Sequence, residues 1–206
     1  MEKKICKTLT IAGFDGSGGA GIQGDMKTFS ALECYGTTVL TAIPIQNTQG
    51  VQGVYEVSAQ CVSDQIKAIF DDIEIDAIKI GMLHRKEIIY AVIDTLALYQ
   101  PKNIVLDPVM VAKSGDRLLL QNAIDAMRTK LFPLITVLTP NLLEAQDLLG
   151  RSITTKKEME QAALELIRMG PQAVVVKGGH LEGNPDDCVC IDGQIHWLLS
   201  ERIPTK

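Results

Sequence analysis

The chain has 206 residues, of which 46% are hydrophobic and 22% charged, the mix of an ordinary globular protein rather than a disordered or fibrous one. Its net charge of −5 argues against a nucleic-acid surface, because binding to phosphate backbones needs clustered Lys and Arg, so a small-molecule partner is expected. No apolar run reaches the roughly 18 residues of a membrane span, and no signal-peptide pattern opens the chain, so we expect a cytoplasmic protein. Its five cysteines are too sparse and irregular for a disulfide framework.

Apolar runs rich in β-forming residues alternate with helical patterns along most of the chain. We expect strands at 9–12, 37–43, 77–80, 104–106, 135–138 and 173–176. Hydrophobic spacing predicts helices at 22–32, 59–70, 86–99, 118–131, 141–149 and 157–169. This alternation implies parallel strands joined by right-handed crossovers, and therefore an α/β sheet with helices on both faces.

The last part of the chain has a different pattern. "CVCIDGQIHWLL" alternates around Asp192-Gly193, a dipeptide favoured in two-residue turns, which predicts an antiparallel edge hairpin at 189–199. No helical pattern follows before Lys206, although a sheet covered on both faces usually ends on a helix. We therefore expect a single domain over residues 1–206 that lacks its C-terminal segment.

A glycine-rich loop separates the first predicted strand from the first predicted helix, in "LTIAGFDGSGGAGIQGDMKTFSAL". Such a loop presents backbone N–H groups and the positive end of a helix dipole, which suits an anion or a polar ligand. Gly16, Gly18 and Gly21 match the dinucleotide fingerprint G-x-G-x-x-G literally. The next strand ends in "AIPIQNT" without the acidic residue that would hold a ribose, and the loop also lacks the Gly-Lys of a Walker A motif, so neither reading is favoured.

Polar or glycine-rich segments follow six of the predicted strands. They are the loop after Ala12, "QNT" at 46–48, "GML" at 81–83, "DPVMVAKSGD" at 107–116, "TPNLLEA" at 139–145 and "KGGH" at 177–180. Ligands of open α/β sheets bind outside the carboxyl ends of the strands, so these segments predict one site at that edge.

Six blocks of the sequence, in order and spacing, resemble the hydroxymethylpyrimidine phosphate kinases of the ribokinase-like fold. They are "AGFDGSGGAGIQGDMKTFSALECYG", "QNTQGV", "KIGML", "LDPVMVAKSGD", "TPNLLEA" and "VVVKGGH". The resemblance runs from about Lys7 to the terminal "RIPTK" and implies a three-layer α/β/α fold with a mostly parallel sheet and an antiparallel edge hairpin. It also implies a homodimer that uses ATP and Mg²⁺ to phosphorylate 4-amino-5-hydroxymethyl-2-methylpyrimidine and its monophosphate in thiamine biosynthesis.

The same resemblance implies two sets of site residues. The pyrimidine pocket would be lined by Gly13, Ala20, Asp25, Gln46, Met82 and Val109. The phosphate side would use Asp107 and Glu144 for the metal ion, and Asn141 and Lys177 for the nucleotide. Six of these residues have a simpler alternative: Asp25 as a complement of the helix dipole, Gln46 as part of an ordinary polar loop, Met82 as a core residue, Asn141 as a helix N-cap, Asp107 as a strand end and Lys177 as surface charge.

One feature of the family is missing from this sequence. Members continue past a segment like "RIPTK" into a Thr-His-Gly-Thr-Gly-Cys type turn that carries the presumed catalytic cysteine, and none of the five cysteines here takes that place. The catalytic residue is therefore left unassigned. Two alternatives stay open at this stage: a pyridoxal or pyridoxine kinase, whose substrate has a similar ring, and a non-catalytic pyrimidine-binding domain if the protein ends at Lys206.

Overall fold

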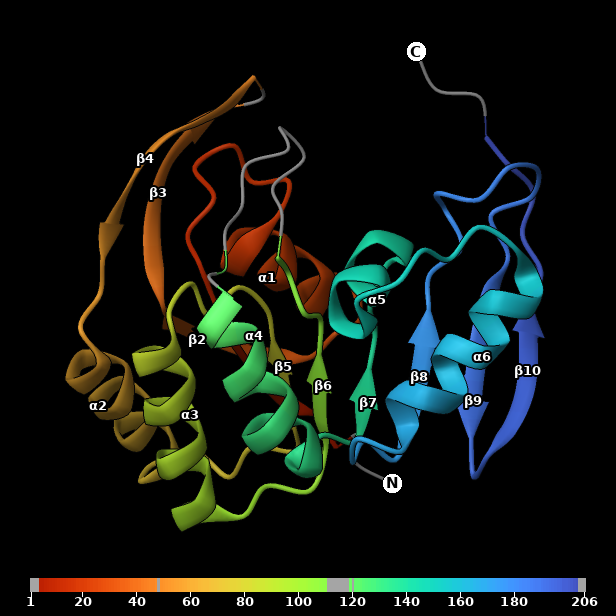
Figure 1. Cartoon of the computed structure of the whole chain (residues 1–206). Coiled ribbons are helices and arrows are strands. Elements are labelled where there is room, and N and C mark those ends of the chain that lie inside the picture. The colour runs from red at the N-terminus through yellow and green to blue at the C-terminus, as the bar shows by residue number, and fades with distance from the viewer. Residues whose placement is uncertain (1–3, 48, 111–118, 120, 204–206) are drawn as a thin grey trace.

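The computed structural model describes residues 4–47, 49–110, 119 and 121–203, and within them it forms one large sheet and one small ribbon (Figure 1). The large sheet has eight strands in the order β10-β9-β8-β7-β6-β5-β1-β2. Its parallel strands are β1 (Lys7–Ala12), β2 (Tyr35–Leu40), β5 (Ala77–Ile80), β6 (Ile104–Leu106), β7 (Val137–Leu138) and β8 (Ala173–Val176). The antiparallel edge consists of β9 (Asp187–Ile191) and β10 (Gln194–Leu198).

The helices lie on both sides of this sheet. They are α1 (Gly21–Ala31), α2 (Ala59–Phe70), α3 (Lys86–Tyr99), α4 (Gln121–Ala126), α5 (Leu142–Leu149) and α6 (Lys156–Ile167). A π-helical turn (Met127–Leu131) and a 3-10 turn (Phe132–Leu134) follow α4. Figure 1 shows α3, α4 and α6 in front of the sheet and α1 behind it.

The strands present two different faces, which the register identifies. Ile78 and Ile80 of β5 and Ile104 and Leu106 of β6 are fully buried in the main hydrophobic core. The alternate residues, including Lys79 and its partner Val105, are only half buried and lie on the face that α1 covers at β1 and β2. Among the described helices, α1 alone packs on this second face, which brings its polar side chains onto β1 and β5.

The prediction of one strand at 37–43 was wrong, because the chain changes sheets at Thr41. Strand β2 ends at Leu40, and Thr41 is held by two hydrogen bonds, from its N–H to the Ala12 carbonyl oxygen and from its hydroxyl to the Met82 carbonyl oxygen. The chain then leaves the large sheet as β3 (Ala42–Asn47), which pairs with β4 (Gly50–Glu56) in a separate antiparallel ribbon. Gln46 and Asn47 of "QNT" are therefore part of a ribbon rather than of a loop after a central strand, and Thr48 lies outside the described residues.

Other predicted elements agree closely with the structure. The bounds of α2, α3, β5, β6 and β8 are those predicted. The hairpin turn at Asp192 and Gly193 has φ angles of 52° and 74°, as a type I′ turn requires. The helix predicted at 118–131 is shorter, since α4 gives way to the π-helical turn at Met127, and residues 118 and 120 lie outside the described part. In the described residues, no helix is long and apolar enough to cross a membrane.

Candidate active site

The parallel strands end at one edge of the sheet, and most predicted site residues follow directly after them. Gly13 follows β1, Met82 lies two residues after β5, and Asp107 follows β6. Asn141 and Lys177, which follow β7 and β8, face each other in an isolated parallel bridge, and the Lys177 N–H donates to the Pro140 carbonyl oxygen at 2.8 Å. The segments that follow β1, β5, β6, β7 and β8 therefore lie at the carboxyl edge as predicted, as far as they are described, whereas Gln46 and Asn47 belong to the separate ribbon.

The glycine-rich loop is folded around the carboxylate of Asp15, a residue that the sequence analysis did not select. Asp15 is 3% exposed. One of its oxygens accepts hydrogen bonds from the Ser17 backbone N–H (3.0 Å) and hydroxyl (2.7 Å). The other accepts from the N–H groups of Gly19 (3.0 Å) and Ala20 (2.7 Å). The N–H groups that were expected to face a ligand thus already bind an anion belonging to the loop itself.

The charged form of the Asp15 carboxylate is strongly favoured. Burial by itself raises the pKa of Asp15, but hydrogen bonds from the Gln46 side chain, from Ser17 and from Ala20 outweigh it and hold the pKa well below its ordinary value of 3.8. Asp15 is therefore a carboxylate at every physiological pH. Ala20, one of the predicted pocket residues, is a backbone donor to it. The sequence Asp-Gly-Ser is typical of a turn in which the Asp side chain accepts hydrogen bonds from nearby backbone N–H groups. This pattern could have identified Asp15 as the centre of the loop.

The glycines of this loop make room for other parts of the protein. Gly21 has a φ of 56°, and a Cβ atom there would collide with the carbonyl oxygen of Gly13. A Cβ at Gly13 would in turn collide with the methyl group of Met82, which is almost completely buried. Met82 therefore lies against the backbone of the loop, as expected for a residue lining the same pocket.

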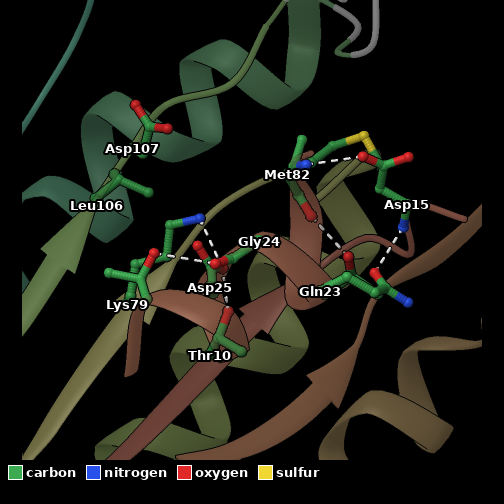
Figure 2. Close-up of polar contacts among 12 residues, drawn as sticks. Thr10, Asp15, Gln23, Gly24, Asp25, Lys79, Met82, Leu106 and Asp107 are labelled. Carbon is green, nitrogen blue, oxygen red and sulfur yellow. Dashed lines mark hydrogen bonds and ion pairs between the residues drawn. The ribbon is translucent and has the colours of Figure 1, made fainter. Parts of the chain in front are cut away.

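Asp25, on α1, is held by two residues of the sheet face beneath it (Figure 2). Its Oδ2 atom accepts hydrogen bonds from the Thr10 hydroxyl at 2.6 Å and from the Lys79 ammonium group at 2.9 Å. Thr10 is fully buried, and both charged side chains of the ion pair are mostly covered. The space for the ammonium group depends on Gly81, where a Cβ would lie 2.8 Å from the Lys79 Nζ atom. Lys79 was not predicted as a site residue, because it lies in an otherwise apolar strand pattern.

On the phosphate side, Asp107 and Lys177 form an ion pair with 2.7 Å between Oδ1 and Nζ. Asn141 is the N-cap of α5, as the simpler alternative supposed: its Oδ1 accepts from the Glu144 N–H at 2.9 Å. Glu144 completes this capping box by accepting from the Asn141 N–H at 2.7 Å. The predicted role of Asn141 in nucleotide binding stays a prediction beside this structural one.

Glu144 is an acid in an unfavourable environment for its charge. It is 5% exposed. Burial, assisted by the negative charge of Asp107, raises the pKa of Glu144 to about 7, although the hydrogen bond from Asn141 and the charge of Lys177 act in the opposite direction. Lys177 is paired with Asp107 and lies opposite Asn141, whose N–H donates to Glu144, so the three charged groups form one cluster.

The donor set of this cluster fits Mg²⁺. Carboxylate oxygens are the protein ligands that Mg²⁺ prefers, and two are available in Asp107 and Glu144. The described residues contain no group of three or more His, Cys, Asp or Glu side chains that could hold a metal ion alone. Mg²⁺ commonly takes one or two carboxylates and completes its coordination with substrate phosphates and water, so two carboxylates suffice for a metal that arrives with a nucleotide.

The loop after Lys177 is fixed by Arg202, another residue that the sequence did not indicate. The Arg202 guanidinium donates to the carbonyl oxygens of Gly179 (3.2 Å), Leu181 (2.7 Å) and Gly183 (2.7 Å). Gly178 passes so close to Asp186 that a Cβ atom would collide with the Asp186 carbonyl oxygen. Together these contacts hold the chain immediately beyond Lys177 in one conformation.

The remaining predicted pocket residue, Val109, lies at the edge of the described structure. It is half buried, and its N–H donates to the Asp107 carbonyl oxygen at 2.8 Å. Residues 111–116 of the block "DPVMVAKSGD" lie outside the described residues.

Comparison with known proteins identifies the family. The family model described as phosphomethylpyrimidine kinase matches residues 15–206. The hydroxymethylpyrimidine/phosphomethylpyrimidine kinase of Escherichia coli is 47% identical, over 98% of this chain and 77% of the relative. That of Rhizobium meliloti is 50% identical, over 96% of this chain and 75% of the relative.

Two solved structures are also similar. A phosphomethylpyrimidine kinase from Clostridium difficile has a TM-score of 0.88 at 43% identity, covering 95% of this chain and 85% of that one. An ADP complex of Bacillus subtilis pyridoxal kinase has a TM-score of 0.89 at 38% identity, covering 98% and 77%. With a family model that matches nearly all of the chain and relatives at 47–50% identity, the chain belongs to the phosphomethylpyrimidine kinase family.

Proposed function

We propose that this protein is an ATP-dependent kinase that phosphorylates 4-amino-5-hydroxymethyl-2-methylpyrimidine and then its monophosphate, in thiamine biosynthesis. The observation that carries the proposal is the arrangement of two different polar groups at one edge of the sheet of a phosphomethylpyrimidine kinase fold. Asp25 and Gln46 lie on the side of the glycine loop, and the Asp107–Glu144–Lys177 cluster follows β6 to β8. The first group suits a polar ring, and the second suits a metal-bound triphosphate.

On the ring side, the proposed contacts are Gly13, Ala20, Asp25, Gln46, Met82 and Val109. A ring nitrogen and an exocyclic amine need one donor and one or more acceptors, which the Gln46 amide and the Asp25 carboxylate supply. Lys79 and Thr10 hold the Asp25 carboxylate on α1, so that its orientation does not depend on the ligand. Met82 adds apolar contact beside the loop.

On the phosphate side, Asp107 and Glu144 would hold Mg²⁺ together with the nucleotide. When bound there, the metal would neutralise negative charge on the phosphate oxygens, which together with positioning supplies most of the catalysis of phosphoryl transfer. Lys177 would provide a second positive charge, and the Asn141 amide N–H groups would donate to phosphate oxygens. Since Lys177 is paired with Asp107 in this structure, binding of the metal–nucleotide complex must redistribute that ion pair.

None of the five cysteines is proposed as a catalytic group. Cys188 and Cys190 are fully buried in β9. Burial raises the pKa of Cys188 to about 12, which is opposite to the lowered pKa of a reactive thiolate. Cys6 and Cys34 precede β1 and β2, at the amino ends of the strands rather than at the carboxyl edge. The single-domain organisation, the homodimer and the cytoplasmic location stay predictions from the sequence and the family.

The test is a kinase assay with Mg-ATP on the product of the complete reading frame, with the aminopyrimidine, its monophosphate and pyridoxal offered separately. We expect ADP release and a mass gain of one phosphoryl group on each pyrimidine, with slower turnover of pyridoxal. Pyridoxal as the preferred substrate would replace the proposal by a pyridoxal kinase, and tight pyrimidine binding without turnover would replace it by a binding domain.

A further inference from the structure

We propose that Lys79 is a specificity-determining positioning residue, whose ammonium group holds Asp25 so that one carboxylate oxygen is left to accept a hydrogen bond from the exocyclic amine of the substrate. This inference rests on the proposed function, in which Asp25 contacts the pyrimidine ring. Lys79 acts through Asp25 and need not touch the ligand.

The first observation is the place of Lys79 in the sheet. It lies in β5 between Ile78 and Ile80, which are buried in the main core, and its own side chain lies on the opposite face, where it reaches α1. A Cβ atom at Gly81 would lie 2.8 Å from the Lys79 Nζ atom, so the ammonium group extends toward the carboxyl edge. Gly81 directly precedes Met82, a proposed pocket residue, and the ammonium group therefore lies close to the segment that enters the proposed ring site.

The second observation is that Lys79 and Thr10 bind the same oxygen of Asp25 (Figure 2). Oδ2 accepts hydrogen bonds from the Lys79 ammonium group at 2.9 Å and from the Thr10 hydroxyl at 2.6 Å. Among the described residues, none donates a hydrogen bond to Oδ1. The Asp25 side chain keeps 18% of its surface exposed, so a ligand can still reach the oxygen that the protein leaves without a donor.

Stability alone does not account for a lysine at this position. Removing an ion pair from water costs free energy that the attraction between the charges only partly offsets, and replacing such a pair by apolar side chains is often neutral or stabilising. The Lys79–Asp25 pair is mostly covered, with 24% and 18% of the two side chains exposed. What this pair supplies, and an apolar contact would not, is a charged carboxylate in a fixed orientation.

The consequence for a ligand follows from the chemistry of Oδ1. As the partner of an ammonium group, Asp25 is an ionised carboxylate, which only accepts hydrogen bonds. Oδ1 therefore requires an N–H or O–H donor from the ligand. The exocyclic amine of an aminopyrimidine is such a donor, whereas a ring without the amine leaves Oδ1 unpaired. A site built to bind a polar substituent discriminates strongly against an analogue that lacks it.

The experiment compares Lys79→Met with the wild-type protein, using two ligands. They are 4-amino-5-hydroxymethyl-2-methylpyrimidine and the same compound without its 4-amino group. Calorimetry measures both affinities, and their ratio reports the preference for the amine. Loss of the ammonium group leaves Asp25 without its fixed orientation, so this ratio should fall by about tenfold. A purely structural role of Lys79 would weaken both ligands equally and leave the ratio as in the wild-type protein.

Asp25→Ala tests whether Lys79 acts through Asp25. In this background the carboxylate is already absent, so adding Lys79→Met should not lower the ratio further. A second fall of about tenfold in the double variant would overturn the inference. Lys156→Met is the matched control, because the Lys156 ammonium group also pairs with an aspartate, Asp186 at 2.6 Å, but from α6. Its loss should leave the ratio unchanged.

Thr10→Val keeps the test decisive if Lys79→Met does not fold. It removes the other donor to Oδ2 but keeps the ion pair and nearly the same side-chain volume, and the ratio should fall by about threefold. A wild-type ratio in folded Lys79→Met overturns the inference alone, as does a wild-type ratio in Thr10→Val where Lys79→Met does not fold. A wild-type protein that binds neither pyrimidine overturns the proposed function instead.

Discussion

Asp15 on the ring side and Glu144 on the phosphate side are acids of almost equal burial, at 3% and 5% exposure, yet their pKa values shift in opposite directions. Asp15 collects hydrogen bonds from backbone N–H groups, a hydroxyl and an amide, so its charged form is stabilised more than burial penalises it. Glu144 accepts one backbone hydrogen bond and lies near the negative charge of Asp107, so burial prevails. The donors around a buried acid can therefore outweigh the effect of burial on its charge, as they do at Asp15.

This difference separates two kinds of binding site. On the ring side, the charge of the Asp15 carboxylate is stabilised without a ligand, because neutral N–H and O–H groups of the loop donate hydrogen bonds to it. On the phosphate side two carboxylates share one lysine, and a bound cation would relieve the remaining repulsion. If the proposed function is correct, the first group recognises the ring and the second receives the charge that comes with the nucleotide.

The largest effect is expected on turnover. Asp107→Asn and Glu144→Gln should each lower kcat by about 10²–10³, the usual cost of removing one group that stabilises transition-state charge. Turnover is measured across a Mg²⁺ titration, with Glu158→Gln as the control. If both variants keep wild-type kcat at low Mg²⁺, the metal site has been placed wrongly.

The unusual pKa of Glu144 should appear in the stability of the metal-free protein. Its pKa is about 7 in the fold against an ordinary 4.5, so between these values the native chain holds more protons than the unfolded chain. The free energy of unfolding should therefore fall as the pH rises from about 4.5 to 7, by up to about 3 kcal/mol, and level off above. Urea unfolding from pH 5 to 8 checks this, and a slope that persists in Glu144→Gln would assign it to another group.

On the ring side, Asp25→Ala should weaken binding of the aminopyrimidine by about 1–3 kcal/mol, because a partner group in the pocket loses its hydrogen bond. Gln46→Ala should act similarly. Nucleotide binding should change little, since neither residue belongs to the phosphate-side cluster. Calorimetry with each ligand measures both effects, and unchanged pyrimidine affinity in the two variants would reject the ring-side assignment.

The smallest expected effect is on the free energy of unfolding, and it tests the hydrogen bonds that stabilise the charge of Asp15. Ser17→Ala removes one of its donors and should lower the free energy of unfolding at pH 7 by about 1 kcal/mol. Because the pKa of Asp15 is held below 3.8, this stability is present above that pH and is lost as the pH falls further. Urea unfolding of Ser17→Ala is compared with that of the exposed Ser152→Ala, and equal stabilities would mean that the hydroxyl contributes nothing.

Elements with strong local signals could be read from the sequence. The helices α2 and α3 and the strand β8 have clear hydrophobic periods between turn residues, and their bounds were predicted without error. Strand β4 has two glycines and no alternation, and it forms only because β3 leaves the large sheet to pair with it. Local propensity contains no information about that pairing.

The residues of the candidate site also fall into those that the sequence indicated and those that it did not. The resemblance selected Asp107 and Lys177, which are 70 residues apart and meet in the fold. It did not select Lys79 or Arg202, because each supports another residue through a contact distant in sequence, 54 residues in the case of Lys79 and Asp25. Asp15 was overlooked because glycine loops are read as cradles for external ligands, whereas this one encloses a side chain of its own.

The contacts of Arg202 also impose an order on the folding of the chain. The carbonyl groups that it binds lie 19 to 23 residues earlier, on the other side of the β9–β10 hairpin. During synthesis, the segment beyond Lys177 therefore emerges well before the residue that fixes it, and it must wait for the hairpin to form, a microsecond event once its residues are free. The phosphate side of the site should accordingly be assembled late, after the glycine loop around Asp15, whose partners Ser17, Gly19 and Ala20 are all local.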